Sequence, residues 1–507
     1  MKMTKYKLSE LVEVTRGASL SGQFYAEEGK LIRLTLGNFN MNGGGFKKNT
    51  SKTDLYFTGT VRDEFILNEG DIITPLTEQS LGLLGTTARI PESGKYIQSQ
   101  DVALIRCKKG LLDPNFCYYL ISSSIVRQQL SAAAQQTKIR HTSPEKIKDC
   151  TVWVPDFDVQ KNIGRILTDI DNKIAINRQI NDNLEAMAKQ LYDYWFVQFD
   201  FPNEEGKPYK SSGGAMVWNE KLKREIPEGW NVANVFDELS VQYGFPFSTE
   251  LFTEEPTSIP VVRIRDILEN SVSAYSEEEV DEKYKLQKQD LLVGMDGNFH
   301  MNYWNDNVSY LNQRSVRLRA KSKSTVSIMQ AKYDIAPYIK AKELRAKGST
   351  VGHLSDKDLK ELFVLVCPNI DFRNKFDSIL AEIIENRCEM IELTKQRDEL
   401  LPLLMNGQAS VNYHLSASTS ISFDISVLFL NFTNGNSLYE TISLDYQCFA
   451  LPLHSKENTH GTIQEDKRHI QQRQRQGDKH ARERFLAFFY KCTSTIHQAA
   501  FGYAWCY

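Results

Sequence analysis

The sequence lacks the local motifs that mark a self-contained enzyme. No GxxxxGK[ST] phosphate-binding loop occurs, and no glycine-rich loop follows a predicted strand. The 8 cysteines are scattered without a CxxC pair, which argues against a zinc ribbon or a dithiol redox site. We therefore expect no metal site, no catalytic residue and no cofactor bound by this chain.

Long apolar runs and a strong charge excess are also missing. Stretches such as VLFLNF, from residue 427, fall far short of the ~20 residues of a membrane helix. The first residues lack the apolar core of a signal peptide, so we expect a cytoplasmic protein with reduced thiols. The net charge of -3 over 507 residues argues against a uniformly basic nucleic-acid clamp, but it does not exclude local basic faces.

One combination of strand, proline and helix is written twice, about 210 residues apart. QTKIRHTSPEKIKDCTVWVP (136–155) aligns with GSTVGHLSDKDLKELFVLVCP (348–368), which pairs His141 with His353. Three further matches precede it in the same order: residues 31–39 with 261–268, 64–74 with 283–293, and 96–108 with 310–322. Matches in one order indicate duplication of a whole unit that contains short alternating strands and ends in a long helix.

A long helix is predicted after each closing strand, over about residues 159–196 and 372–404. Apolar residues step by alternating four and three, which is a heptad seam. The first seam contains Ile163, Leu167, Ile170, Ile174, Leu184, Ala188, Leu191 and Trp195. The second contains Ile379, Ile383, Met390, Leu393, Leu400 and Leu404. Polar residues interrupt both seams, and such residues fix register and partner: Asn177, Asn181, Asn386 and Arg397.

These helices are too long to serve only their own units. A helix of about 38 residues spans about 57 Å, whereas a small domain is about 26 Å across. Packing of each helix on its own unit remains the alternative. We expect an α+β protein in which two similar domains are joined by two long antiparallel coiled-coil helices, as a pseudo-twofold tandem repeat.

Two similar domains held at a fixed spacing suit duplex DNA, whose half-sites are read at separations set by protein geometry. Basic residues cluster near the two histidine turns, although a solvated surface would also explain them. The candidate DNA-binding residues are Lys138, Arg140, His141, Lys146, Arg317, Arg319, Lys347, His353, Asn298 and Asn302.

Base-reading residues are expected where the two copies differ most. These stretches are residues 38–49 and 78–79 in the first unit, and 242–247 and 296–307 in the second. The stretch GNFHMNYWND (297–306) combines polar side chains with aromatic ones, although a glycine-bearing hairpin explains it equally well.

With these motifs the chain resembles the specificity subunit of type I restriction–modification systems. The resemblance rests on the closing phrases CTVWVP and LFVLVCP and on the two histidine turns. It also rests on NDNLEAMAKQLYDYWFVQFDFPN (181–203), GKPYKSSGGAMVWNEKLKREIPEGW (206–230) and LTKQRDELLPLLMNGQASV (393–411). It covers about residues 5–413.

The resemblance implies a domain organisation. Target-recognition domain 1 would occupy residues 1–157, the central helix 158–200, a linker 201–230, target-recognition domain 2 residues 231–370, and the C-terminal helix 371–410. The character of the sequence changes at about residue 414. We expect 411–507 to be an atypical tail without an established role, for which disorder is one alternative.

The resemblance also implies a non-catalytic DNA reader. Each domain would read one half of a split site in double-stranded DNA, and the helices would set the gap. Modification (methyltransferase) and ATP-dependent restriction subunits would supply the chemistry, with S-adenosylmethionine, ATP and Mg on those partners. The candidate residues for helix pairing and subunit docking are Ile170, Ile174, Asn177, Leu184, Trp195, Ile383, Met390, Leu393 and Leu400.

Two other classes of function remain at this point. An autonomous DNA methyltransferase or nuclease with its own recognition domains would transfer methyl groups or cut DNA alone. DPNF (113–116) only partly matches a methyltransferase motif, and a helix start with Pro114 in its first turn explains it better. A coiled-coil scaffold without DNA affinity would show no salt-dependent DNA binding.

Overall fold

The computed structural model describes residues 1–41, 44–78, 82–133, 140–256, 258–346, 352–411 and 428–430. Its backbone contacts divide the chain into Met1–Ile442 and Ser443–Tyr507, and all described residues belong to the first unit. The expected tail therefore lies almost wholly outside the described residues. In the described part of the chain, no helix is long and apolar enough to cross a membrane.

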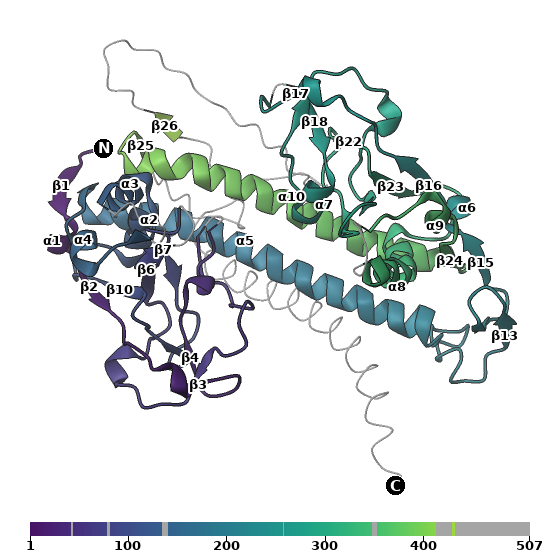
Figure 1. The fold of residues 1–507 in the computed structure, drawn as a ribbon, viewed down its shortest axis with the longest axis horizontal. Coiled ribbons are helices and arrows are strands. Elements are labelled where there is room, and N and C mark those ends of the chain that lie inside the picture. Colours follow the sequence, from purple (N-terminus) through teal and green to yellow (C-terminus); the bar gives the residue numbers. More distant parts are fainter. Residues whose placement is uncertain are drawn as a thin grey trace, which may run out of the picture. The chain divides into compact units, whose positions relative to one another are not determined.

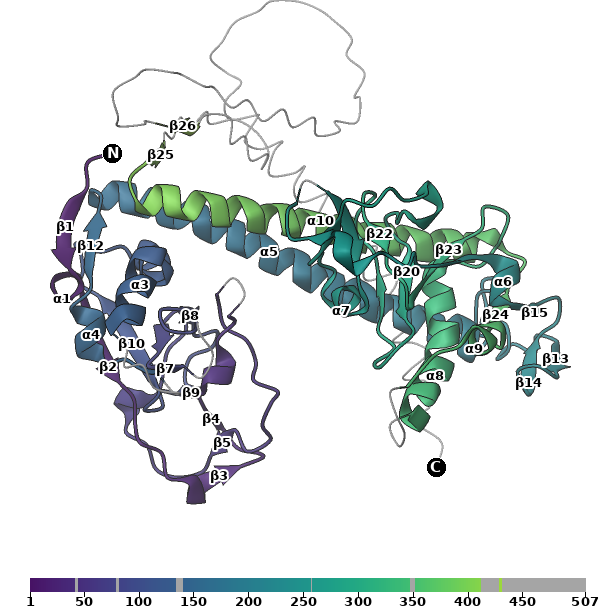
Figure 2. The same ribbon diagram turned by 45° about the horizontal axis from the view of Figure 1, so that its top comes forward.

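Two helices of 36 residues each, α5 (Phe157–Tyr192) and α10 (Ile370–Met405), lie side by side (Figures 1 and 2). They are antiparallel, because Asp171 contacts Arg397 whereas Asn181, further along α5, contacts the earlier residue Asn386. Asn369 caps the start of α10 by accepting a hydrogen bond from the Asp371 N–H at 2.9 Å. The predicted antiparallel pair is confirmed. Beyond Tyr192, α5 continues as a π-helical turn, Asp193–Val197.

Head 1 comprises the elements from β1 to β12. Most of its strands belong to one of three sets of hydrogen-bonded neighbours: β1 (Thr4–Lys7) with β12 (Thr151–Val154); β2 (Val12–Arg16), β10 (Val102–Cys107), β6 (Ile72–Pro75) and β8 (Ala88–Arg89); and β3 (Tyr25–Ala26), β5 (Tyr56–Phe57), β4 (Leu31–Arg33) and β9 (Tyr96–Ile97). The further elements are α1 (Leu8–Leu11), α2 (Pro114–Ser122), α3 (Ser124–Ala133), α4 (Pro144–Lys148), and the paired strands β7 (Thr77–Glu78) and β11 (Arg140–His141).

Head 2 comprises the elements from β15 to β24 and repeats this topology. Its strand groups are β15 (Asn231–Asn234) with β24 (Phe363–Val366); β16 (Leu239–Tyr243), β23 (Ser315–Ala320), β20 (Leu291–Gly294) and β21 (Met301–Tyr303); and β17 (Phe252–Thr253), β19 (Tyr275–Ser276), β18 (Ile259–Val262) and β22 (Tyr310–Leu311). Its helices are α6 (Val235–Glu238), α7 (Ile264–Glu269), α8 (Ile328–Ala346) and α9 (Asp356–Lys360).

The two heads are duplicates in strand order and in strand direction. Each head has two four-stranded sheets: the one with longer strands, which contains β2 or β16, is called the larger sheet, and the one with shorter strands, which contains β4 or β18, is called the small sheet. In each small sheet one contact is parallel, β4 with β9 and β18 with β22, and the remaining pairs are antiparallel. One glycine follows the first strand of each larger sheet. A Cβ on Gly17 would meet the Gln98 carbonyl oxygen at 2.2 Å, and one on Gly244 would meet that of Asn312 at 1.9 Å. The predicted duplication is confirmed, and both heads share this close approach of a glycine to a backbone carbonyl.

Each head buries parts of both long helices in its core. The core of head 1 includes Ile163 and Leu167 from the start of α5 and Leu404 from the end of α10. The core of head 2 includes Phe376 from the start of α10 and Ala188 from the end of α5. Each helix therefore begins on its own head and ends on the other, which rules out packing on its own unit alone.

The segment between α5 and head 2 is folded. It contains a hairpin of β13 (Met216–Asn219) and β14 (Arg224–Pro227). The Phe201 ring stacks on Trp230 with centroids 5.0 Å apart, and both rings contact Phe372 of α10. The stretch predicted as a linker thus packs against the start of α10. Beyond α10, β25 (Ala409–Val411) pairs with β26 (Leu428–Leu430).

Candidate nucleic-acid interface

The two repeated histidines occupy equivalent places beside the larger sheets. His141 of β11 pairs with Thr77 of β7, and His353 forms the corresponding antiparallel bridge with Asp296. The His353 Nδ1 lies 2.6 Å from Asp296 Oδ1, and Arg314 Nη1 lies 2.6 Å from Oδ2. Burial raises the pKa of Asp296, but hydrogen bonds from His353 and Arg314 outweigh it and lower that pKa overall. His141 itself is exposed.

The basic residues of head 1 help to fix the local fold. Arg140 Nη1 lies 3.0 Å from the carboxylate of Glu78, which is 2% exposed. Glu78 also accepts hydrogen bonds from the backbone N–H groups of residues 82–84, at 2.9 to 3.1 Å. Lys146 donates to the Ala133 carbonyl at 2.8 Å and is only half-buried. Lys138 lies outside the described residues.

A groove of about 1210 Å³ lies between head 1 and the end of α10. Its lining includes three guanidinium groups and two carboxylates, together with the serines of α2 and α3. The charged members are Glu78, Arg127, Arg140, Arg397 and Asp398. This groove lies beside the predicted DNA-binding turn, and its guanidinium groups can donate to phosphate or base acceptors.

In head 2, two predicted phosphate contacts are engaged inside the protein. Arg317 is 6% exposed, and its guanidinium donates to the carbonyls of Lys283 and Lys285 at 3.3 and 3.4 Å. Burial, and then the neighbouring Arg319, lower the pKa of Arg317. Arg319 forms a two-pronged ion pair with Asp290 at 2.6 and 2.7 Å. This packing argues against DNA contact by Arg317, and it holds two of the three guanidinium nitrogens of Arg319, Nε and Nη2, on Asp290.

The two asparagines proposed for head 2 differ in their surroundings. Asn298 is exposed, and its backbone carbonyl accepts from the His300 N–H. Asn302 donates to the carbonyls of Ile267 and Leu268 at 3.1 and 3.0 Å, and it accepts from Arg387 of α10 at 3.1 Å. Asn302 therefore fastens head 2 to the helix pair. Lys347 lies outside the described residues.

Each head is joined to both long helices by a chain of polar contacts. Tyr119 of head 1 donates to Asp171 of α5 at 2.6 Å, and Asp171 accepts from Arg397 of α10 at 2.8 Å. At the other end, Arg387 connects Asn302 with Glu185 of α5, which lies 2.9 Å away. The sequence indicated the seam position of Arg397 but gave no sign of its partners.

Most residues predicted for docking hold the helix pair together. Five of them are buried: Ile170, Ile174, Asn177, Trp195 and Ile383. Trp195, for example, stacks on Phe372 with ring centroids 4.4 Å apart. Four are half-buried: Leu184, Met390, Leu393 and Leu400.

The sequence interpretation missed an apolar stripe beside the seam. On α5, Ile176, Ile180 and Met187 are 52%, 37% and 48% exposed, respectively. Their spacing of four and seven residues places them on one side of the helix. The signal was available as a second apolar series, offset from the seam.

Comparison with known proteins identifies the family. The family model "Type I restriction modification DNA specificity domain" matches residues 1–186 and 227–402. The chain is 25% identical, over 319 residues, to the type I restriction enzyme MjaIX specificity subunit of Methanocaldococcus jannaschii, which covers 60% of this chain and 71% of that protein. It is 26% identical, over 187 residues, to the EcoBI specificity subunit of Escherichia coli, covering 36% and 37% of the two chains.

The fold agrees with a solved structure. The crystal structure of the type I restriction–modification S subunit from M. genitalium matches with a TM-score of 0.50 and 18% identity, over 80% of this chain and 96% of that one. This likeness concerns the fold. Both proteins have the same class of architecture, with two heads of the target-recognition type and long helices packed together.

The chain belongs to the type I restriction–modification DNA specificity family. It is the DNA specificity subunit of a type I system and a non-catalytic component of that enzyme, whose cofactors belong to the modification and restriction subunits. The first of the predicted functions is confirmed, in place of the autonomous methyltransferase or nuclease and the scaffold without DNA affinity.

Proposed function

We propose that head 1 and head 2 each read one half of a split DNA target, and that the α5–α10 pair fixes the gap between the halves. The observation that carries this proposal is that each head is built on both helices, through Tyr119–Asp171–Arg397 at one end and Asn302–Arg387–Glu185 at the other. Heads fastened in this way keep a defined separation, as reading two half-sites requires.

In head 1, the exposed His141, the partly exposed Lys146 and the groove residue Arg140 support a DNA-contacting surface. In head 2 the corresponding candidates are His353 and the exposed Asn298. Lysine and histidine hold phosphates, and asparagine pairs with adenine edges. Arg317, Arg319 and Asn302 instead support the architecture.

The helix pair also offers a surface for the modification subunits. The exposed stripe of Ile176, Ile180 and Met187 suits burial under another apolar helix, because exposed apolar residues on one helix face mark interaction sites. The restriction subunit would join the same assembly. Such a complex acts on DNA in the cytoplasm.

Mapping of methylated bases in the host genome, with this gene intact and deleted, tests the reading role. A split motif should disappear on deletion, and persistence of every motif would refute the proposal. Comparison of the two genomes also yields the half-sites and the gap.

A paired insertion tests the ruler. Four residues added after Asn177 and four after Glu389 extend both helices at a level where these side chains hydrogen-bond. At 1.5 Å per residue the pair lengthens by about 6 Å, or about one to two base pairs of DNA. The gap should grow by that amount while both half-sites stay the same. Altered half-sites with an unchanged gap would contradict the ruler.

A further inference from the structure

The two heads differ clearly in the length of one connection of the small sheet, the segment that follows β4 in head 1 and β18 in head 2. In head 1 the connection from β4 to β5 runs through residues 34–55, whereas in head 2 the one from β18 to β19 takes only residues 263–274. Both begin alike, since the Thr35 N–H donates to Asn38 and the Arg263 N–H donates to Asp266, each at 2.9 Å. In head 2 the chain forms α7 at this point, whereas in head 1 it follows a longer path, called here the excursion, before it reaches β5.

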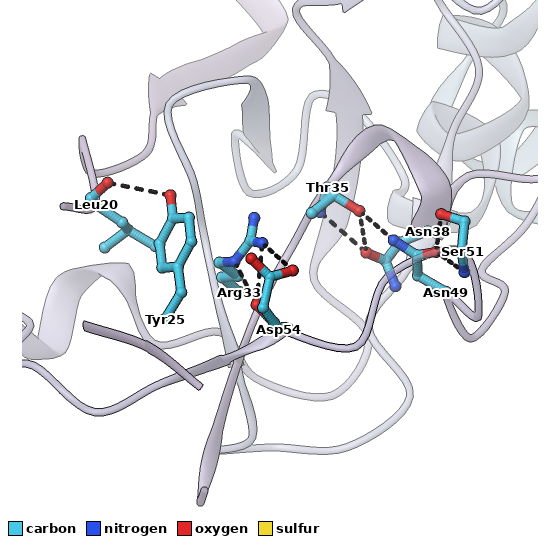
Figure 3. A network of polar contacts seen from close by, with 8 residues as sticks. All are labelled: Leu20, Tyr25, Arg33, Thr35, Asn38, Asn49, Ser51 and Asp54. Carbon is cyan, nitrogen blue, oxygen red and sulfur yellow. Dashed lines mark hydrogen bonds and ion pairs between the residues drawn. The ribbon is translucent and has the colours of Figure 1, made fainter. Parts of the chain in front are cut away.

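Buried amides hold the start of this excursion in place (Figure 3). Asn38 is 2% exposed and donates to the Lys47 carbonyl at 3.2 Å. Asn49 is 6% exposed, donates to Thr35 Oγ1 at 2.8 Å and accepts from the Ser51 N–H at 2.9 Å. Buried amides are stabilising when hydrogen-bonded in this way. The asparagines of a stretch expected to read bases therefore fix the backbone instead.

The far end of the connection is fixed by a second polar group (Figure 3). Arg33, 7% exposed, donates to the Asp54 carbonyl at 3.1 and 3.0 Å and pairs with its carboxylate at 3.2 Å. The Arg33 guanidinium also lies 3.8 Å from the centre of the Tyr25 ring. Both ends of the excursion are thus pinned to the head.

The outer part of the connection borders the groove. The Gly45 N–H donates to the Thr87 carbonyl at 2.9 Å, and Met41 and Gly44 line the groove together with Arg140. Lys47 and Lys48 are exposed. Within the described ranges, neither lysine ammonium has a hydrogen bond or an ion pair. Two exposed cations therefore lie on a backbone segment that is fixed by hydrogen bonds, a few residues from the part of the connection that lines the groove.

We propose that residues 39–41 and 44–50, called here the reading loop, specify bases in the half-site of head 1, with Lys47 and Lys48 donating to guanine edges. The inference rests on the proposed function, because it assumes that each head reads one half-site. Lysine donates to guanine O6 and N7 in the major groove, and a loop already braced loses less conformational entropy on binding. Head 2 lacks the long connection, so the loop specifies only one half of the target.

The test uses the complete complex of this chain with its modification subunits. Methylation mapping of the wild type first supplies the target. Competition binding then compares three duplexes: the intact site, the site with half 1 scrambled and the site with half 2 scrambled. In K47Q/K48Q, discrimination at one half-site should fall by about 10-fold or more, and discrimination at the other should stay within about twofold.

A matched control removes the same charge from the same head. Lys30 and Lys52 are exposed and lie outside the reading loop, so K30Q/K52Q should retain discrimination at both half-sites. Asn49→Ala keeps both lysines but removes their brace. It should weaken discrimination at the same half-site as K47Q/K48Q, with a melting temperature that shows a folded chain.

Two results overturn the inference. One is unchanged discrimination at both half-sites in K47Q/K48Q. The other is equal weakening on all three duplexes with a shallower salt dependence, which would make the lysines phosphate contacts only. If the double variant fails to assemble, the single variants K47Q and K48Q are tested in the same competition assay with the same criteria. A wild type that discriminates at neither half-site would instead refute the proposed function.

Discussion

Asn386 of α10 donates a hydrogen bond of 2.9 Å to the side-chain oxygen of Asn181 of α5, inside the seam of the helix pair. Asn181 in turn donates to the backbone carbonyl of Ile383 at 3.1 Å. Asn181 is only 6% exposed. These contacts tie one level of α5 to one level of α10, and a shifted register would leave buried polar atoms unpaired.

Asn181→Ala should lower the free energy of unfolding by about 2 kcal/mol, because it leaves the Asn386 amide and the Ile383 carbonyl without this partner. N181L/N386L should recover much of the loss, since an apolar pair needs no hydrogen bond. Denaturant unfolding followed by helical circular dichroism measures both. N183A, at an exposed position of α5, serves as the control and should change stability by less than about 0.5 kcal/mol. A harmless N181A would contradict the role of this pair.

Arg397→Ala should cost about 2 to 3 kcal/mol, because Arg397 is 8% exposed and its loss leaves Asp171 without its cation. Arg397→Lys should recover only part of this. The guanidinium reaches Asp171 with one nitrogen and Asp398 with two others, at 2.8 to 2.9 Å, and an ammonium cannot span both carboxylates. Thermal unfolding compares the two with K395A, an exposed neighbour on α10. Equal stability of R397K and the wild type would show that charge alone suffices.

Gly17→Ala and Gly244→Ala should each destabilise their own head by about 3 kcal/mol or more. The new Cβ would lie 2.2 Å and 1.9 Å, respectively, from a backbone carbonyl oxygen that cannot move aside cheaply. Gly22→Ala is the control, since its Cβ would meet nothing closer than 3.9 Å. Hydrogen exchange resolved along the chain should place each loss of protection in the mutated head. Loss in both heads at once would mean that they unfold together.

Asp334 of α8 should make stability fall as pH rises. Burial raises its pKa from 3.8 to about 6, although hydrogen bonds from Tyr192 and from the Leu365 N–H act in the opposite direction. Between about pH 4 and pH 6 the folded state therefore binds more protons than the unfolded state. The stabilisation that the Asp334 carboxyl contributes is fully present below its pKa in the unfolded state. It is lost, by about 2 to 3 kcal/mol, as pH rises through its pKa in the folded state.

Unfolding midpoints of the wild type and D334N, taken from pH 4 to pH 8, check this dependence. The wild type should lose stability relative to D334N across the window, because asparagine does not ionise. D182N, at an exposed position of α5, controls for the loss of a negative charge. A difference between wild type and D334N that stays constant with pH would show that Asp334 keeps one protonation state throughout.

The helix pair could be predicted from the sequence because its signal is periodic and local. Ile163, Leu167 and Ile170 step along one face of α5, and a similar apolar spacing recurs in α10. The observed bounds differ from the predicted ones by one or two residues at the starts, where Asp156 and Asn369 precede the helices. The duplicated histidine turns were recognisable for the same reason, since each copy lies within about twenty residues of sequence.

The candidate interface was harder to predict, because exposure depends on distant partners. Arg317 and Asn302 have the composition of DNA contacts, yet they bond to Lys285 and Arg387, which are remote in sequence. Asn38 and Asn49 likewise form hydrogen bonds within the connection that they stabilise. Ile176 lies one position before the buried seam residue Asn177, and only the docked heads and the opposing helix show that it remains uncovered.

The sequence by itself determined the duplicated units, the two long helices and their pairing seam, because periodicity and repetition are properties of neighbouring residues. The tertiary structure decided which polar side chains form their hydrogen bonds inside the protein and which face outward. That outcome depends on contacts between segments far apart in the chain, and a buried amide or guanidinium must find its partners there or destabilise the fold.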